Sequence, residues 1–301
     1  MKKFLVLFLT SIVFTNTMLV SIALGDVPKE VQQETKSNID ISGKVWNRWT
    51  SENFVVCSLS DTQAKYLNFN LEQVKTWIYT RWGMPDTKFS AECRLICVDD
   101  KKLFKKFFGL DKSAVEIRRN ADGTIKLSVI FILLDDKPSR TIPIPLTEVC
   151  LAELEQSYNV KFGWWVHRGM GQLNGTLGEI KANFIDLHSK LNHDEAIYFS
   201  ESLLKMTEDQ YWKESPANRL AFDRCACVMC LLIRKEFGEE KMLSFIKGTA
   251  SGKDAKEALY KLYKFDSYSH FDVTLKAYMK IVASDIVENK TPNSYLQIVP
   301  K

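Results

Sequence analysis

The pattern of apolar residues changes near Pro145. Beyond this point the spacing is helical almost throughout, with breaks at glycines such as Gly238, Gly248 and Gly252. Before it, short runs rich in β-branched and aromatic residues alternate with helical patterns, as in a sheet with helices packed against it. We therefore predict an α+β fold, with a small N-terminal α/β sheet unit followed by a mostly helical C-terminal region.

Individual elements follow from the same periodicities. The first region predicts strands at 54–59, 94–98, 115–119 and 125–134, and helices at 62–82 and 101–108. Turn residues at 120–123 indicate that the last two strands form an antiparallel pair. The second region predicts helices at 146–158, 164–191, 194–205, 217–237, 239–249, 255–263 and 268–286.

The N-terminus has the form of a secretory signal. Lys2 and Lys3 precede an apolar run, and small residues lead up to Gly25. We predict a signal peptide at 1–25 and an exported protein, periplasmic or extracellular. The alternative is an uncleaved segment that anchors the chain in the membrane, because about 20 apolar residues can span a bilayer.

The predicted domain organisation follows from these patterns. The signal is followed by a polar linker, an N-terminal α+β subdomain, a helical subdomain and a C-terminal tail, at 26–42, 43–140, 141–290 and 291–301. The chain has 41 basic and 37 acidic side chains, so its charge gives no reason to expect nucleic acid as a partner. A membrane partner is expected only through the N-terminal segment, if it stays uncleaved.

Seven cysteines are an odd number for an exported chain, so at least one would stay unpaired if the others formed disulfides within the chain. Cys225, Cys227 and Cys230 lie in a predicted helix, where positions i, i+2 and i+5 do not converge on one metal ion. We interpret them as small buried apolar side chains, as we do the cysteines of the predicted strands. The disulfide pairing stays open.

Two short segments contain the candidate site residues. Residues 152–156 read Ala-Glu-Leu-Glu-Gln, and residues 165–171 read Trp-Val-His-Arg-Gly-Met-Gly. Together they resemble the two halves of the zinc site of peptidase MA-like metallopeptidases, the gluzincins, which carry His-Glu-x-x-His and then a motif of the type Trp-x-x-Glu-Gly-x-Ala. Segments around 46–56 and 221–259 are similar to the same family, so the resemblance covers most of the mature chain.

The resemblance implies that the zinc ligands are missing. Ala152, Gln156 and Arg168 occupy the three ligand positions, and only Glu153, at the position of the general base, is kept. Alanine offers no lone pair, a glutamine amide is a poor zinc ligand, and a guanidinium repels the ion. We therefore expect no metal and no other cofactor. We also expect Glu153 and Arg168 to face each other in the cleft, because a buried carboxylate needs a cation.

His167 and the neighbouring aromatic residues complete the candidate site. His167 is a rescuing ligand, a general base or a packing residue, whereas His188, His193 and His270 belong to other predicted turns or helices. Trp164 and Trp165 can stack on a sugar or a peptide. The candidate cleft and binding residues are thus Ala152, Gln156, Trp164, Trp165 and Arg168, and the candidate catalytic residues of the degenerate site are Glu153 and His167.

Three functions remain open from the sequence. The first is an exported, catalytically inactive gluzincin-like pseudo-peptidase that binds a peptide or protein partner or acts as a scaffold. The second is a hydrolase with a non-standard centre around Glu153 and His167. The third is a structural component of an envelope assembly.

Overall fold

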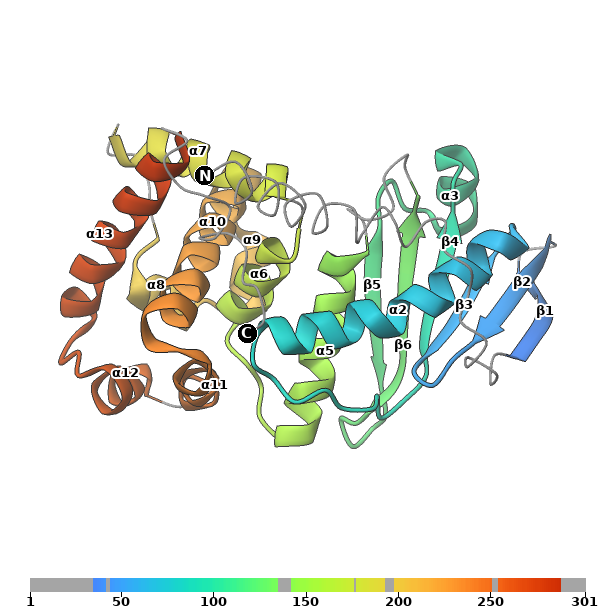
Figure 1. The fold of residues 1–301 in the computed structure, drawn as a ribbon, viewed down its shortest axis with the longest axis horizontal. Coiled ribbons are helices and arrows are strands. Elements are labelled where there is room, and N and C mark those ends of the chain that lie inside the picture. Colours follow the sequence, from blue (N-terminus) through green and yellow to red (C-terminus); the bar gives the residue numbers. More distant parts are fainter. Residues whose placement is uncertain are drawn as a thin grey trace, which may run out of the picture.

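A mixed six-stranded sheet forms the N-terminal half of the protein, in the strand order β1-β2-β3-β4-β6-β5 (Figure 1). The computed structural model describes residues 35–41, 44–134, 142–175, 177–192, 198–250 and 254–287. The predicted signal peptide and C-terminal tail lie outside these residues. The strands are β1 (Thr35–Ile41), β2 (Lys44–Thr50), β3 (Phe54–Ser58), β4 (Cys93–Val98), β5 (Ala114–Arg119) and β6 (Ile125–Leu133). β3, β4 and β6 run parallel, and the other pairs are antiparallel, including the predicted pair β5 and β6.

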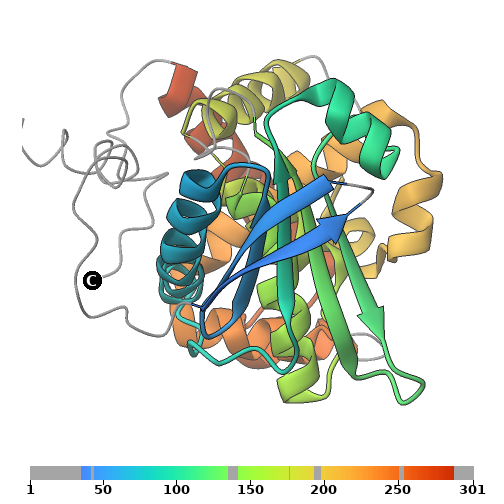
Figure 2. The same cartoon turned by 90° about the vertical axis from the view of Figure 1, so that its right-hand side faces the viewer.

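Helices cover the two faces of the sheet. Helix α2 (Asp61–Arg81) begins at Ser60, whose side chain accepts a hydrogen bond from the backbone N–H of Gln63. Helix α3 (Lys101–Phe108) begins at Asp100 in the same manner and ends at Gly109, whose φ of 69° favours glycine. Figure 2 shows α2 and α3 on opposite sides of the strands. Phe104 of α3 packs in a small cluster with one sheet face, while α2 and α5 cover the other.

The C-terminal region is helical, as the sequence predicts. Its helices are α5 (Pro143–Tyr158), α6 (Trp164–Leu173), α7 (Leu177–Asn192), α8 (Ser200–Lys205), α9 (Glu208–Lys213), α10 (Pro216–Leu232), the π-helical turn η1 (Ile233–Phe237), α11 (Glu239–Gly248), α12 (Ala255–Tyr263) and α13 (Tyr268–Val287). Among the described residues, none of these helices is both long and apolar enough to cross a membrane. The α+β fold class is thus confirmed.

One hydrophobic core runs through both regions. It includes Val56 and Leu95 from the sheet, Leu154 from α5, and Phe222 and Phe271 from the C-terminal helices. The sheet and the helical region therefore bury the same apolar surface together instead of each enclosing a core of its own.

Three predictions of local structure are wrong. The linker predicted at 26–42 contains strand β1, which pairs with β2 through backbone hydrogen bonds that its polar sequence does not reveal. The helix predicted at 164–191 is two helices, because α6 ends at Asn174 before α7 begins. In the helix predicted at 194–205, only 200–205 is described as helical, and residues 193–197 lie outside the described part.

Candidate functional site

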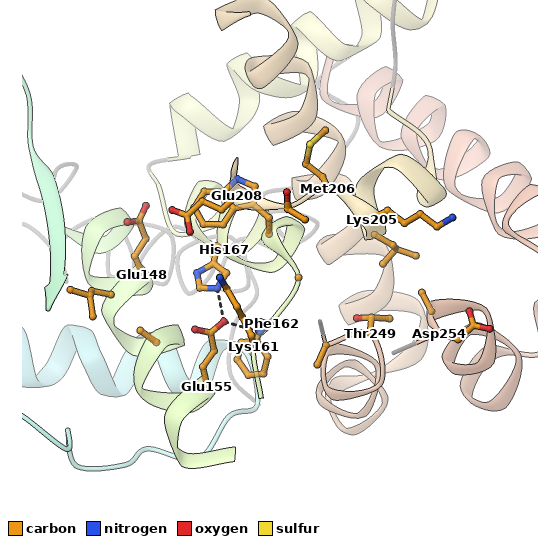
Figure 3. A pocket seen from close by; sticks show the side chains of 18 of the residues that line it. Glu148, Glu155, Lys161, Phe162, His167, Lys205, Met206, Glu208, Thr249 and Asp254 are labelled. Carbon is orange, nitrogen blue, oxygen red and sulfur yellow. Dashed lines mark hydrogen bonds and ion pairs between the residues drawn. The ribbon is translucent and has the colours of Figure 1, made fainter. Parts of the chain in front are cut away.

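A cavity of about 840 Å³ lies where β5, α5 and α6 meet the helices α8, α9 and α12 (Figure 3). Helix α5 contributes Glu148, Ala152 and Glu155, whose spacing places them on one helical face. Helix α6 contributes Trp164 and His167. The cavity therefore lies beside the two motifs that the sequence singles out, and Ala152, Trp164 and His167 are the predicted residues that line it.

Glu153 points away from this cavity. Its side chain is 4% exposed, and its Oε2 atom accepts a hydrogen bond of 2.8 Å from the backbone N–H of Ser90, in the loop before β4. Its Oε1 atom has no hydrogen-bond partner among the described residues. The charge of Glu153 helps to raise the pKa values of the Cys93 and Cys150 thiols, although burial is the larger cause. Glu153 is thus a buried carboxyl group on the sheet side of α5, outside the cavity wall.

Arg168 pairs with Asp223 of α10 and not with Glu153. Its Nε and Nη2 atoms donate to the two oxygens of Asp223 at 2.9 and 2.7 Å, and the hydroxyl of Tyr211 donates to Asp223 at 3.2 Å. Burial lowers the pKa of Arg168, but the hydrogen bond and charge of Asp223, together with Tyr211 and Glu148, raise it overall. The predicted ion pair between Glu153 and Arg168 is therefore wrong. Arg168 does have a carboxylate partner, which lies 55 residues further along the chain, in a helix that packs against α6.

Gln156 and Trp165 also have structural roles outside the cavity wall. The side-chain oxygen of Gln156 accepts a hydrogen bond from the backbone N–H of Ile125, at the start of β6. Trp165 is fully buried and packs against Phe245 with 5.8 Å between ring centroids. Neither residue lines the cavity: Gln156 is half-buried beside the start of β6, and Trp165 lies in the core.

His167 forms a pair with Glu155 inside the cavity (Figure 3). Its Nε2 atom lies 3.0 Å from Oε1 of Glu155, which also accepts a hydrogen bond of 2.7 Å from the backbone N–H of Phe162. The imidazole stacks on Trp164, with centroids 5.4 Å apart and an angle of 23° between the rings. Arg119 of β5 lies 3.9 Å from the other oxygen of Glu155. The carboxylate therefore orients the imidazole, as in acid–base dyads.

Glu155 is a cavity residue that was not among the predicted site residues. Its position three residues after Ala152 places both on the same helical face, and this spacing could have revealed it. Glu208, the first residue of α9, was also missed because α9 was not predicted. The capping box of Thr207 and Gln210 was the available signal for that helix.

Glu148 and Glu208 bring two carboxylates to the same part of the cavity (Figure 3). Burial raises the pKa of Glu148, Arg168 and His167 lower it, and the charges of Glu208 and Asp223 raise it further. The Nη1 atom of Arg168 is 3.7 Å from Glu148. This end of the cavity is therefore acidic.

The wall offers few groups for covalent or metal chemistry. Within the described ranges, no group of three or more His, Cys, Asp and Glu side chains is arranged to hold a metal ion. The hydroxyl of Thr207 is hydrogen-bonded to Gln210, and the hydroxyl of Thr249 donates a hydrogen bond to the carbonyl of Ile246. The cysteines are free and buried elsewhere. What the cavity does offer is a His–Glu pair, an aromatic ring and several charges.

Comparisons with protein-family models, with curated proteins and with solved structures give no match. The likeness to peptidase MA-like proteins therefore rests on the sequence segments named above, and membership of that family stays a proposal.

The other histidines do not add to the site. His270 is exposed on α13, where its Nδ1 atom lies 3.1 Å from Asp266. The side chain of His188 and the whole of His193 lie outside the described residues. His167 is thus the histidine that lines the cavity among those whose side chains are described.

Proposed function

We propose that the protein is a non-catalytic, peptidase-like binding protein that holds a peptide segment in its cavity. The observation that carries the proposal is the cavity of about 840 Å³ beside α5 and α6, at a place where the motif positions for zinc ligands hold other residues. Ala152 contributes only a methyl group to the wall, and the guanidinium of Arg168 is hydrogen-bonded to both carboxylate oxygens of Asp223. The volume falls in the range of about 300–1,000 Å³ that is typical of ligand pockets.

The edge strand β5 favours a peptide as the ligand. β5 is the last strand of the sheet, next to β6, and its alternate residues Val115, Ile117 and Arg119 line the cavity. An edge strand can pair with an extended peptide through its backbone, while pockets take alternate side chains. A segment bound along β5 would therefore place its side chains against α5 and α6.

Two neighbouring residues of β5 give a direct test. Val115 faces the cavity, whereas Glu116 is exposed on the other face of the strand. We expect Val115→Trp to fill the cavity and weaken binding of peptides from a library by at least about tenfold. Glu116→Trp should bind them as the natural protein does, because it adds the same ring outside. Peptide binding that is absent from the natural protein, or equal in both variants, would contradict the proposal.

A hydrolase remains a second candidate, with a corrected centre. The hydrogen-bonded pair of His167 and Glu155 in the cavity favours it, since such a pair can take a proton from water. Cleavage of a fluorogenic peptide by the natural protein, with loss of cleavage in His167→Gln, would establish this candidate. Stoichiometric zinc in the purified protein would favour it too, whereas intact peptides after long incubation favour the binding protein.

Export is part of the proposal and rests on the sequence pattern of residues 1–25. Cell fractionation tests it. A stable complex with envelope proteins that survives filling of the cavity by Val115→Trp would instead support a structural component of an envelope assembly.

A further inference from the structure

An exposed tryptophan lies next to the cavity on helix α9. Trp212 is 54% exposed and lies outside the cavity wall. Glu208, one helical turn earlier, does line the cavity, and residues four apart share one face of a helix. The face of α9 that borders the cavity therefore continues outward to an aromatic ring in contact with solvent.

The ring of Trp212 extends an aromatic surface that begins inside the cavity. Trp164 of the cavity wall is half-buried, and its ring centroid lies 6.4 Å from that of Trp212, with 59° between the rings. The buried ring of Tyr211 contacts both, with centroid distances of 5.6 Å to Trp164 and 5.1 Å to Trp212. An exposed ring that is held in this manner loses little conformational freedom when it binds a ligand.

Arg219 of α10 limits the chemistry of that ligand. Its guanidinium lies over the ring of Trp212, 5.3 Å from the centroid. The cation that a tryptophan ring attracts is therefore already supplied by the protein. A second cation would be repelled by the guanidinium, so an apolar side chain is the better partner for the exposed part of the ring.

The distance between the two tryptophan rings matches the repeat of an extended peptide. Side chains two residues apart in a strand lie on the same face, about 6.4–6.8 Å from each other. The rings of Trp164 and Trp212 are separated by 6.4 Å. A peptide residue that contacts Trp164 in the cavity would therefore bring the side chain two positions away to Trp212.

We infer that the peptide site extends beyond the cavity to Trp212, which receives an apolar side chain two residues away from the one that contacts Trp164. The inference rests on the proposed function, because it assigns a second contact to the same bound peptide. The peptide is then recognised by the spacing of two apolar residues in addition to its fit to the cavity.

The test uses the full mature chain and three blocked nine-residue peptides of alanine and serine. One contains a single phenylalanine, one contains two adjacent phenylalanines, and one contains two phenylalanines with one residue between them. In calorimetry, the peptide with the separated pair should bind at least about tenfold more tightly than the other two. Trp212→Ala should reduce this preference to less than about threefold, while binding of the peptide with one phenylalanine changes by less than about threefold.

Two further variants serve as controls. Trp212→Phe keeps an aromatic ring at this position and should retain a preference of more than about threefold. Tyr260→Ala removes another exposed ring with a cation over it, since Tyr260 is 59% exposed and Nζ of Lys264 lies 5.6 Å from its centroid. Tyr260 lies outside the cavity wall, so this variant should keep the full preference.

The outcomes separate this inference from the proposed function. Equal binding of the separated and the adjacent pair to the natural protein would overturn the inference and leave a peptide-binding protein without this spacing rule. That comparison needs no variant, so it decides the question even if Trp212→Ala does not fold. A full preference in folded Trp212→Ala would also overturn the inference. So would a dimer of the natural protein that Trp212→Ala abolishes, because a second copy would then cover the ring. Failure of all three peptides and of the library to bind would overturn both the inference and the proposed function.

Discussion

Arg168 joins α6 to α10 through a largely desolvated ion pair. Its side chain is 18% exposed and that of Asp223 is 7% exposed. Removing one partner leaves a buried charge unpaired, so Arg168→Met should lower the free energy of unfolding by about 3–5 kcal/mol in urea denaturation. The double change with Asp223→Leu should cost less than the sum of the single changes.

An exposed pair provides the control for this cycle. Lys205→Met breaks the contact with Glu201, whose side chain is 55% exposed, and should cost less than about 1 kcal/mol. Additive effects of Arg168→Met and Asp223→Leu would contradict the coupling that we describe.

Glu153 should respond in the opposite manner. Within the described part of the chain, the buried carboxyl group has no cationic partner, and Ser90 is its one hydrogen-bond donor. Glu153→Gln keeps that acceptor and removes the charge, so the free energy of unfolding should fall by less than about 1 kcal/mol or should rise. A loss as large as that of Arg168→Met would mean that Glu153 has a cationic partner after all.

Glu148 should make stability depend on pH. Its pKa in the folded protein is raised above the ordinary value of 4.5, chiefly by burial. Its contribution to stability is therefore present below the unfolded-state pKa and is lost as the pH rises through the higher folded-state pKa. Relative to the natural protein, Glu148→Gln should become progressively more stable between about pH 4 and pH 7. Thermal unfolding of both proteins across this range measures the difference, and a constant difference would contradict the prediction.

At the level of elements, α6 and α10 pack unusually closely at Gly169. A Cβ atom there would lie 2.5 Å from Sγ of Cys230 and 2.6 Å from the carbonyl oxygen of Ala226. Gly169→Ala should therefore destabilise the protein by about 1–3 kcal/mol, because the backbone of α10 must shift. In the same helix, a Cβ at Gly171 meets only Ile144, at 3.8 Å. Gly171→Ala should be neutral or should stabilise by up to about 1 kcal/mol. Equal thermal shifts for both variants would contradict this difference.

Elements with strong local signals were predictable from the sequence. The helix predicted at 101–108 is confirmed with the same limits, because Asp100 and Gly109 mark both of its ends. β1 was missed because its pairing depends on backbone hydrogen bonds to β2 and not on an apolar pattern.

The candidate site was predictable only where it is local. Ala152 and His167 were placed near the right cavity by their motifs. The partner of Arg168 was not, because Asp223 lies 55 residues away in the chain and only the folded structure brings the two together.

At the scale of the molecule, all seven thiols are free and buried. Burial is the largest cause of a raised pKa for each of them, so little of the reactive thiolate forms near neutral pH. The native protein should react very slowly with Ellman's reagent, and all seven thiols should react after unfolding without a reductant. Fewer reactive thiols in the unfolded chain would reveal disulfides formed during export, and fast labelling of the native protein would contradict the burial.

The shared core has a consequence for how the molecule can be divided. The sheet face that holds Val56 and Leu95 is covered by α2 and α5, and α5 belongs to the other half of the chain. In a fragment that ends before α5, the part of this face that α5 covers would be exposed to water. In the helical fragment, the apolar side of α5 would be exposed instead. The two fragments are therefore expected to aggregate when separate and to recover solubility only by reassociating. β5 and α6 belong to different fragments and both line the cavity. A bound peptide would therefore contact both fragments and stabilise their complex.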